Sequence, residues 1–171
     1  WPSYFSKEDR LKGISLQSAI WKRPAPDTIP TDAKAAGLYM ICTLSKHEAE
    51  KNGFTDALML DYKGRVAEST GANIFFVIGG EIHTPIPDCF LNGITRQTVI
   101  DLASQQGMKV VERDIYPDEI QNAEEIFLTG SAVEVTPVGK INDQTFKVGD
   151  ITSKILNSYM KEVDPNYQES N

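Results

Sequence analysis

A glycine turn that leads into a helical pattern is the first feature that could do chemistry. Residues 91–101 read LNGITRQTVID, in which Gly93 is followed by Ile94 and Thr95. The first turn of a helix has unpaired backbone N–H groups and the positive end of the helix dipole, so it attracts anions. Gly93 lets the chain pass close to a ligand, and Thr95 adds a hydroxyl group. The alternative is an ordinary capping turn in which Thr95 satisfies its own helix.

Lys34 is the candidate nucleophile. In TDAKAAGLYMIC it is the only charged residue between Asp32 and Lys46, and small and apolar residues follow it. A lysine in such surroundings is expected to be desolvated, which favours the neutral, nucleophilic amine. The alternative is a lysine that snorkels to water at a helix start. Tyr39 could share a ligand with Lys34 only if Lys34 lies before the regular helix or in its first irregular turn.

Glu68 is the candidate acid. In RVAESTGANIFFV it ends a strand pattern and enters a turn, Ser69–Ala72, that carries no other charge. A carboxylate at this place could hold a protonated ring nitrogen, although a solvated turn glutamate is the alternative. Asn73 is expected to stabilise this turn through its side-chain amide rather than to touch a substrate.

A second hydroxyl-bearing turn lies in FLTGSAVEVTPV, where a strand pattern ends in Thr129–Ala132. Its backbone N–H groups could also bind an anion, although an ordinary connection between strands is the alternative. Glu134 is interpreted as structural. Together, the two turns, the lysine and the acid favour a cofactor with a phosphate, an electrophilic carbon and a basic ring nitrogen. Pyridoxal phosphate has these groups, and proteins bind it through a lysine Schiff base with an acid on the ring nitrogen.

The composition bounds the remaining classes of function. The chain has 171 residues, 40% hydrophobic and 24% charged, which suits one globular domain with a sizeable core. The net charge of −7 argues against nucleic acid as the main partner, and no apolar run reaches the ~20 residues of a membrane span. Cys42 and Cys89 form no CxxC motif, which favours a reduced, cytoplasmic setting. His47 and His83 lack a Cys/His cluster, so we expect no metal site.

Hydrophobic patterns and turn residues predict a mixture of strands and helices without strict alternation. We therefore expect an α/β (α+β-like) fold, a distorted mixed-sheet barrel or layer with flanking helices rather than a doubly wound sheet. The first expected helix runs from Thr31 or Asp32 to about Asn52, and the others are Thr95–Gln106, a short turn over Pro117–Asn122, and Ile151–Glu162. The expected strands are Gly13–Trp21, Asp56–Asp61, Arg65–Ala67, Asn73–Ile78, Glu81–His83, Met108–Ile115, Ile126–Thr129 and Val133–Val138.

Three spaced motifs resemble the signature of class IV (fold type IV) aminotransferases. They are Glu68-Ser-Thr-Gly-Ala-Asn73-Ile-Phe75, Ile82-His-Thr84 and Leu91-Asn-Gly93-Ile94-Thr95-Arg96. The stretch from DAKAAGLYM to VEVTPVG is similar to the C-terminal, larger domain of branched-chain amino-acid aminotransferases. The resemblance covers about Pro24 to about Gly149.

The resemblance implies pyridoxal phosphate as cofactor and a role for each matching residue. Lys34 matches the Schiff-base lysine, which is also the base for the substrate Cα proton. Tyr39 matches the tyrosine on the phenolic oxygen, and Glu68 the acid on the ring nitrogen. The residues that match phosphate contacts are Ile94, Thr95 and Ser131. Ala132 lies where the family binds the substrate carboxylate.

The resemblance also implies substrates and partners. The expected substrates are branched-chain L-amino acids with 2-oxoglutarate. Within the same family, the alternatives are a D-amino-acid aminotransferase and an aminodeoxychorismate lyase. Outside it, the alternative is a non-catalytic module that binds a phosphate ligand. Because the sequence opens without Met and soon reaches a strand, we expect residues 1–23 to continue from a missing N-terminal domain. Residues 24–162 would form the cofactor-binding large domain and residues 163–171 a flexible tail. We expect a homodimer or higher homo-oligomer.

Overall fold

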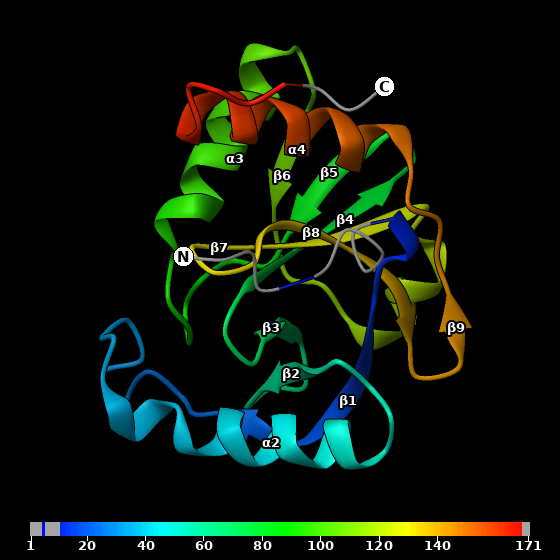
Figure 1. Ribbon diagram of the computed structural model, residues 1–171. Coiled ribbons are helices and arrows are strands. Elements are labelled where there is room, and N and C mark those ends of the chain that lie inside the picture. The colour runs from blue at the N-terminus through cyan, green and yellow to red at the C-terminus, as the bar shows by residue number, and fades with distance from the viewer. Residues whose placement is uncertain (1–4, 6–10, 169–171) are drawn as a thin grey trace.

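The structure is a computed structural model that describes residue 5 and residues 11–168. Its described part contains one nine-stranded sheet with helices on its outside (Figure 1). The strands are β1 (Ile14–Arg23), β2 (Asp56–Asp61), β3 (Val66–Ser69), β4 (Asn73–Ile78), β5 (Glu81–Thr84), β6 (Val110–Glu112), β7 (Glu125–Gly130), β8 (Glu134–Ile141) and β9 (Gln144–Thr145). The helices are η1 (Ala36–Leu38), α2 (Met40–Lys51), α3 (Ile94–Gln105), η2 (Pro117–Asn122) and α4 (Asp150–Val163).

Part of the sheet closes into a barrel, as the sequence predicts. The strand order β3-β2-β1-β8-β7-β4 returns to its start because β3 also pairs with β4. We call these six paired strands the ring. Its pairing is mixed, since β1 runs parallel to both of its neighbours and the other pairs are antiparallel. β5 and β6 extend the sheet from β4 beyond the ring. The expected mixed-sheet barrel with flanking helices is therefore confirmed.

Alternate residues of β4 face two separate cores. Ile74 and Phe76 belong to a cluster drawn from all strands of the ring, which fills the barrel. Phe75 and Val77 belong to a second cluster, beneath α3 and α4, which lie together over one face of the sheet in Figure 1. Phe75 stacks on Phe127 of β7, with ring centroids 5.0 Å apart. Since both faces are buried, β4 reads as the nearly unbroken apolar run NIFFVI.

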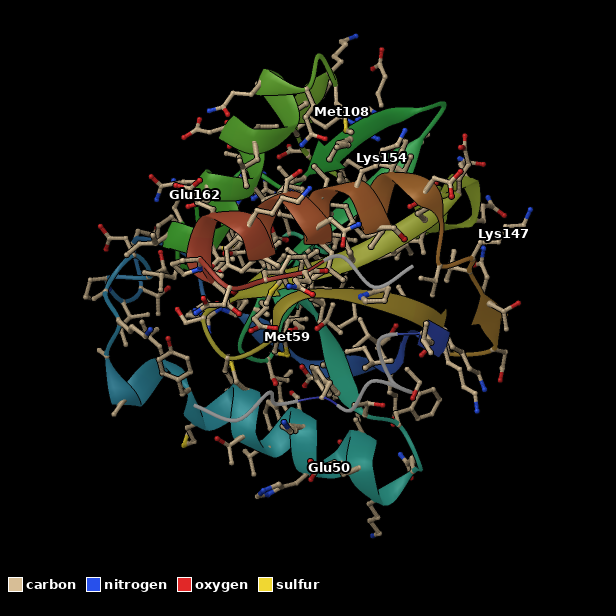
Figure 2. All side chains as sticks on the ribbon, turned by 45° about the horizontal axis from the view of Figure 1, so that its top comes forward. Glu50, Met59, Met108, Lys147, Lys154 and Glu162 are labelled. Atoms are coloured by element: carbon tan, nitrogen blue, oxygen red, sulfur yellow. The ribbon has the colours of Figure 1, made fainter. Side chains whose placement is uncertain are left out.

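The outer helices expose their polar side chains. Figure 2 shows Met59 of β2 in the interior, whereas Glu50 of α2 and Lys154 of α4 lie on the outside. Met59 has no exposed surface, and both charged residues are exposed. No helix among residues 11–168 is long and apolar enough to cross a bilayer.

Two expected elements differ most from the structure, and β9 is a strand that the sequence did not predict. The helix expected from Thr31 or Asp32 begins only at Met40, after turns and the short η1. The Thr31 hydroxyl donates to the Asp88 carbonyl (3.4 Å) and caps no helix. The strand expected over 108–115 is reduced to β6, because the chain then leaves the sheet edge. Ile115 enters the barrel core, where its carbonyl accepts from the Val66 N–H.

The predicted division of the chain at residue 24 stays a prediction. β1 lies between β2 and β8, so the ring includes residues on both sides of that boundary. The flexible tail also stays a prediction. Within its described part, the Tyr167 hydroxyl donates to Asn157 Oδ1 of α4 (2.7 Å). Most of the first ten residues and the last three lie outside the described residues.

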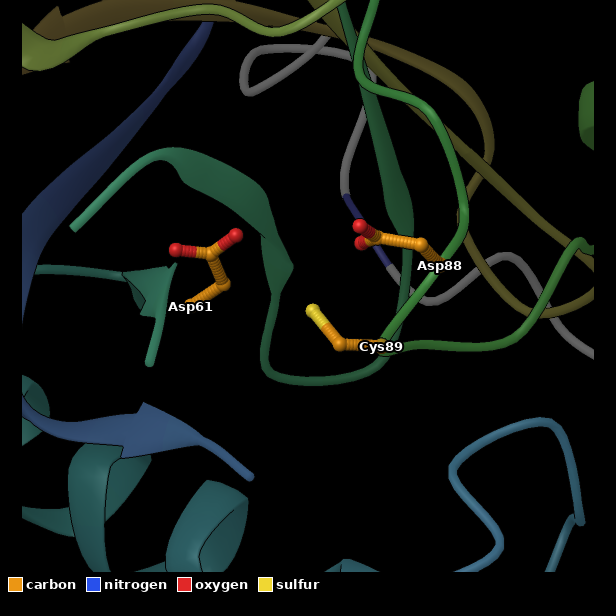
Figure 3. A group of neighbouring side chains, drawn as sticks. All are labelled: Asp61, Asp88 and Cys89. Carbon is orange, nitrogen blue, oxygen red and sulfur yellow. The ribbon is translucent and has the colours of Figure 1, made fainter. Parts of the chain in front are cut away.

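Arg65 holds the hairpin between β2 and β3 against two later segments. Its guanidinium donates to Asp61 (2.5 Å), Asp88 (2.7 Å) and Asp114 (2.7 Å). Figure 3 shows Asp61, Asp88 and Cys89 close together, and their ligand atoms lie within 4.8 Å of one another. Burial raises the pKa of the Cys89 thiol to about 12. Because Arg65 already balances the two carboxylates, we interpret this cluster as a structural ion-pair network.

Replacing Arg65 by Met should lower the free energy of unfolding by about 3–5 kcal/mol, because the buried Asp61 carboxylate loses its partner. Urea unfolding followed by circular dichroism measures this change. Lys63→Gln, which removes an exposed positive charge from the same hairpin, should change it by less than about 1 kcal/mol. Equal effects of the two substitutions would contradict the role given to Arg65.

Candidate active site

A cavity of about 420 Å³ brings together most of the residues that the sequence singles out. Every predicted site residue except Ala132 lines it, and Ala132 follows the lining residue Ser131 directly. The walls come from the end of β1, the segment that leads into α2, the turn between β3 and β4, the start of α3 and the turn after β7. The lining residues are Arg23, Thr31, Ala33, Lys34, Leu38, Tyr39, Glu68, Gly71, Ala72, Asn73, Leu91, Asn92, Gly93, Ile94, Thr95, Thr129, Gly130 and Ser131.

Lys34 and Tyr39 reach the same cavity because Lys34 lies outside regular structure. The chain is irregular at Lys34 and extended at Ala35 (φ −101°, ψ 138°), and η1 begins one residue later. Lys34 therefore lies before the regular helix, as is required if Lys34 and Tyr39 are to contact one ligand. Of the two interpretations of Lys34, exposure favours the lysine that reaches water over the desolvated one, since Lys34 and the small residues after it are exposed. Nothing in the described residues covers that side of the cavity.

Glu68 is a buried carboxylate and not the solvated turn residue of the alternative interpretation. It is 7% exposed at the end of β3. Burial raises its pKa to about 8, the charge of Arg23 opposes this shift, and the charge of Asp56 adds to it. The pKa of Tyr39 is also raised, by burial and then by the negative charge of Glu68. A cationic group in the cavity would therefore stabilise ionised Glu68.

The start of α3 presents unpaired donors to the cavity. Gly93 is the N-cap residue, in an extended conformation and without a side-chain cap bond. Thr95 is buried inside the first helical turn, so it does not act as the N-cap that the alternative requires. Ile94 is 82% exposed at the rim. Within the described chain, no hydrogen bond engages the backbone N–H groups of Ile94 and Thr95, which suits an anion such as a phosphate.

Asn73 positions this helix start. Its amide donates to the Leu91 carbonyl (2.9 Å) and its oxygen accepts from the Gly93 N–H (3.2 Å). The expectation that Asn73 stabilises its own turn, Ser69–Ala72, is therefore wrong: the amide stabilises the turn at residues 91–93. A local sequence pattern does not predict this contact, because Gly93 lies 20 residues after Asn73 in the chain.

Arg96 secures the same segment from the other side. It is 1% exposed, and its guanidinium donates to Asn92 Oδ1 (2.9 Å), to the Pro85 carbonyl (3.0 Å) and to Glu112 (2.6 Å). The resemblance places this residue in the motif without a role. In the structure, it fixes the chain that leads into α3.

The turn after β7 offers hydroxyl groups. Ser131 and Ala132 are exposed, and Ser131 lines the cavity. Thr129, another lining residue, has a buried hydroxyl group with no partner among the described residues. A buried polar atom without a partner is costly, so this wall also suits a ligand with acceptor oxygens. Thr129 was expected only as part of a strand and turn, without a role of its own.

Arg23 also lines the cavity, although nothing in its sequence context predicts a role for it. It ends β1, is 4% exposed, and its Nε lies 3.3 Å from Glu68 Oε1. In the sequence it is one of two adjacent basic residues before Pro24, and nothing there separates it from exposed Lys22. The usual alternation of buried and exposed side chains along a strand would distinguish the two residues. It is absent at this end of β1, because Ile20, Trp21 and Lys22 are all exposed.

Comparison with known proteins gives consistent matches. The family described as amino-transferase class IV matches residues 2–141. A probable branched-chain-amino-acid aminotransferase of Rickettsia felis is 44% identical over 131 residues, which cover 77% of this chain and 45% of that protein. The crystal structure of the Escherichia coli branched-chain amino acid aminotransferase superposes with a TM-score of 0.90 at 34% identity, covering 94% of this chain and 54% of the other.

An aminotransferase from Brucella abortus, solved with the co-factor PLP, has a TM-score of 0.84 and 37% identity, and the match covers 88% of this chain and 54% of that one. The chain spans about half the length of the curated relatives it matches.

The raised pKa of Glu68 predicts that the ligand-free protein loses stability as pH rises from 4.5 to about 8. In this range the folded state holds the Glu68 proton and the unfolded state has released it, so the contribution is complete below 4.5 and lost above about 8. The slope is at most about 1.4 kcal/mol per pH unit. Urea unfolding at several pH values should show a flatter profile for Glu68→Gln. The exposed control Glu162→Gln should keep the parent slope, and a parent slope in Glu68→Gln would contradict the assignment.

Gly93→Ala should destabilise the protein because the added Cβ would lie 2.5 Å from Asn73 Oδ1. In an Asn73→Ala background the same change should cost less, with a coupling of about 1 kcal/mol measured by a double-mutant cycle in urea. Gly37→Ala, whose Cβ meets no atom within 4 Å, is the matched control. Additive costs would show that Asn73 and Gly93 act independently.

Proposed function

Because the chain belongs to the class IV aminotransferases, we propose that it forms the cofactor-binding part of a branched-chain-amino-acid aminotransferase. The observation that carries the proposal is the single cavity shared by an exposed lysine amine, a buried carboxylate and the unpaired N–H groups of a helix start. The names of the relatives support the branched-chain substrates.

We propose pyridoxal 5'-phosphate as the cofactor. The donor set fits this molecule: Ile94, Thr95 and Ser131 would hold its phosphate, and Glu68 would pair with its protonated ring nitrogen. The related Brucella abortus aminotransferase, solved with PLP, supports this assignment. When bound, the cofactor supplies an aldehyde carbon for amines and an electron-withdrawing ring.

Each side chain then has a defined task. Lys34 would hold the cofactor through its Nζ, and its amine would serve as the base that accepts the proton from the substrate α-carbon. Glu68 would pair with the protonated ring nitrogen, and the Tyr39 hydroxyl would donate to the ring's phenolic oxygen. The backbone N–H of Ala132 binds the substrate carboxylate.

The proposed reaction moves an amino group from L-leucine, L-isoleucine or L-valine to 2-oxoglutarate. Since the matches cover only 45% and 53% of the relatives, turnover is proposed for a protein that also contains the counterpart of their remaining part, as a homodimer or higher oligomer in the cytoplasm. D-Alanine as the better amino donor would indicate a D-amino-acid aminotransferase. Conversion of aminodeoxychorismate would indicate a lyase of the same family.

Replacing Lys34 by Ala should lower turnover at least about 100-fold, because the base for the α-carbon proton is lost, while some cofactor binding persists. Activity is measured with L-leucine and 2-oxoglutarate. Borohydride reduction of the yellow protein, followed by peptide mapping, should place the cofactor on Lys34. Lys51→Ala, at an exposed site in α2, should keep the parent rate and label. An unlabelled protein that binds phosphate compounds would instead indicate a non-catalytic phosphate-ligand module.

A further inference from the structure

Arg23 joins three elements that build the cavity. It is the last residue of β1 and is almost fully buried. Its Nη1 donates to the Leu38 carbonyl (3.0 Å) and to Cys42 Sγ (3.3 Å), at the start of α2. Its Nε lies 3.3 Å from Glu68 Oε1, at the end of β3. One guanidinium therefore touches both the acid and the turn that follows Lys34.

The contact with Glu68 supplies charge without using a well-formed hydrogen bond. Arg23 Nε is buried and has no hydrogen-bond partner among the described residues, although Glu68 lies within ion-pair distance. A guanidinium stays protonated even when buried. Glu68 thus receives a permanent positive neighbour and keeps acceptor capacity for a donor in the cavity.

The other groups that face Glu68 cannot replace this charge. Asp56 of β2 adds negative charge, and its own pKa is raised by burial. Tyr39 and Cys42, at the start of α2, have pKa values raised chiefly by burial, so they are neutral near pH 7. Within residues 11–168, Arg23 is the one cationic side chain at ion-pair distance from Glu68.

We propose that Arg23 is a positioning residue that orients the Glu68 carboxyl group toward the cavity, favours its ionised form and, through Leu38, fixes the turn that carries Tyr39. The identity of the donor that faces Glu68, a ring nitrogen, rests on the proposed function. The effect of Arg23 on the orientation and pKa of Glu68 does not. Arg23 need not touch the substrate, because it acts through these neighbours.

The decisive measurement is the titration of Glu68 in the cofactor-free protein. Protein labelled with ¹³C in its glutamates is followed by NMR, and the Glu68 signal is assigned by its loss in Glu68→Gln. Arg23→Met should move the Glu68 midpoint upward by about one pH unit or more, because the opposing positive charge is gone. Arg23→Lys should restore most of this shift. Lys22→Met, which removes the adjacent exposed charge, should leave the midpoint unchanged. An unmoved midpoint in Arg23→Met would overturn the proposal.

A stability cycle keeps the test decisive if Arg23→Met folds poorly. The double variant Arg23→Met/Glu68→Gln should be more stable than Arg23→Met alone at pH 7, because folding then no longer requires Glu68 either to take up a proton or to be buried as an unpaired carboxylate. A double variant no more stable than Arg23→Met would also overturn the proposal.

Pyridoxal phosphate binding separates this role from the proposed function. Its dissociation constant, measured by absorbance titration, should rise at least about tenfold in Arg23→Met, because the oriented carboxylate is lost, and recover partly in Arg23→Lys. If the parent protein does not bind pyridoxal phosphate but the Glu68 midpoint shifts as expected, the proposed function fails and the role of Arg23 stands. If the parent binds it and the midpoint does not shift, the role of Arg23 fails alone.

Discussion

One rung of backbone pairing, Glu68 opposite Asn73, closes the barrel. The same rung holds the two side chains that organise the cavity from opposite directions. Glu68 points to the charge of Arg23, and Asn73 reaches across to the turn at residues 91–93. Because closure and site share this rung, the acid and the anion-binding helix start have a fixed separation. The rest of the cavity is assembled around them.

Buried polar side chains position the catalytic candidates. Thr84 donates to the Ile74 carbonyl (2.9 Å), Asn73 holds the turn before α3, and Arg96 ties the preceding loop to its neighbours. Each of these residues belongs to the spaced motifs of the sequence. The motifs therefore encode a hydrogen-bonded frame that aims one helix start at the cavity, and only a few of their side chains are left to meet a ligand.

The sequence predicts well what depends on local pattern. Strands such as Asp56–Asp61 and Asn73–Ile78 agree to the residue, since their apolar runs are bounded by turn residues. The shared location of Lys34 and Tyr39 also follows from spacing, once Lys34 is placed before the helix. Contacts between distant segments could not be predicted: the long reach of Asn73, the burial of Arg23 and the exposure of Lys34 depend on which strands meet. The barrel was expected as a fold class, whereas the order of its strands could not be predicted from the sequence.

The place of β1 has a consequence for how the chain folds. Ile14 pairs with Val138, while Leu16 pairs with both Asp56 and Ile141, all in parallel. β1 thus pairs with β2, about 40 residues later in the sequence, and with β8, about 120 residues later. Pairing at such sequence distance carries a large loop-closure cost and slows folding. The ring is therefore completed late, and until then β1 offers an open edge to any other chain within reach.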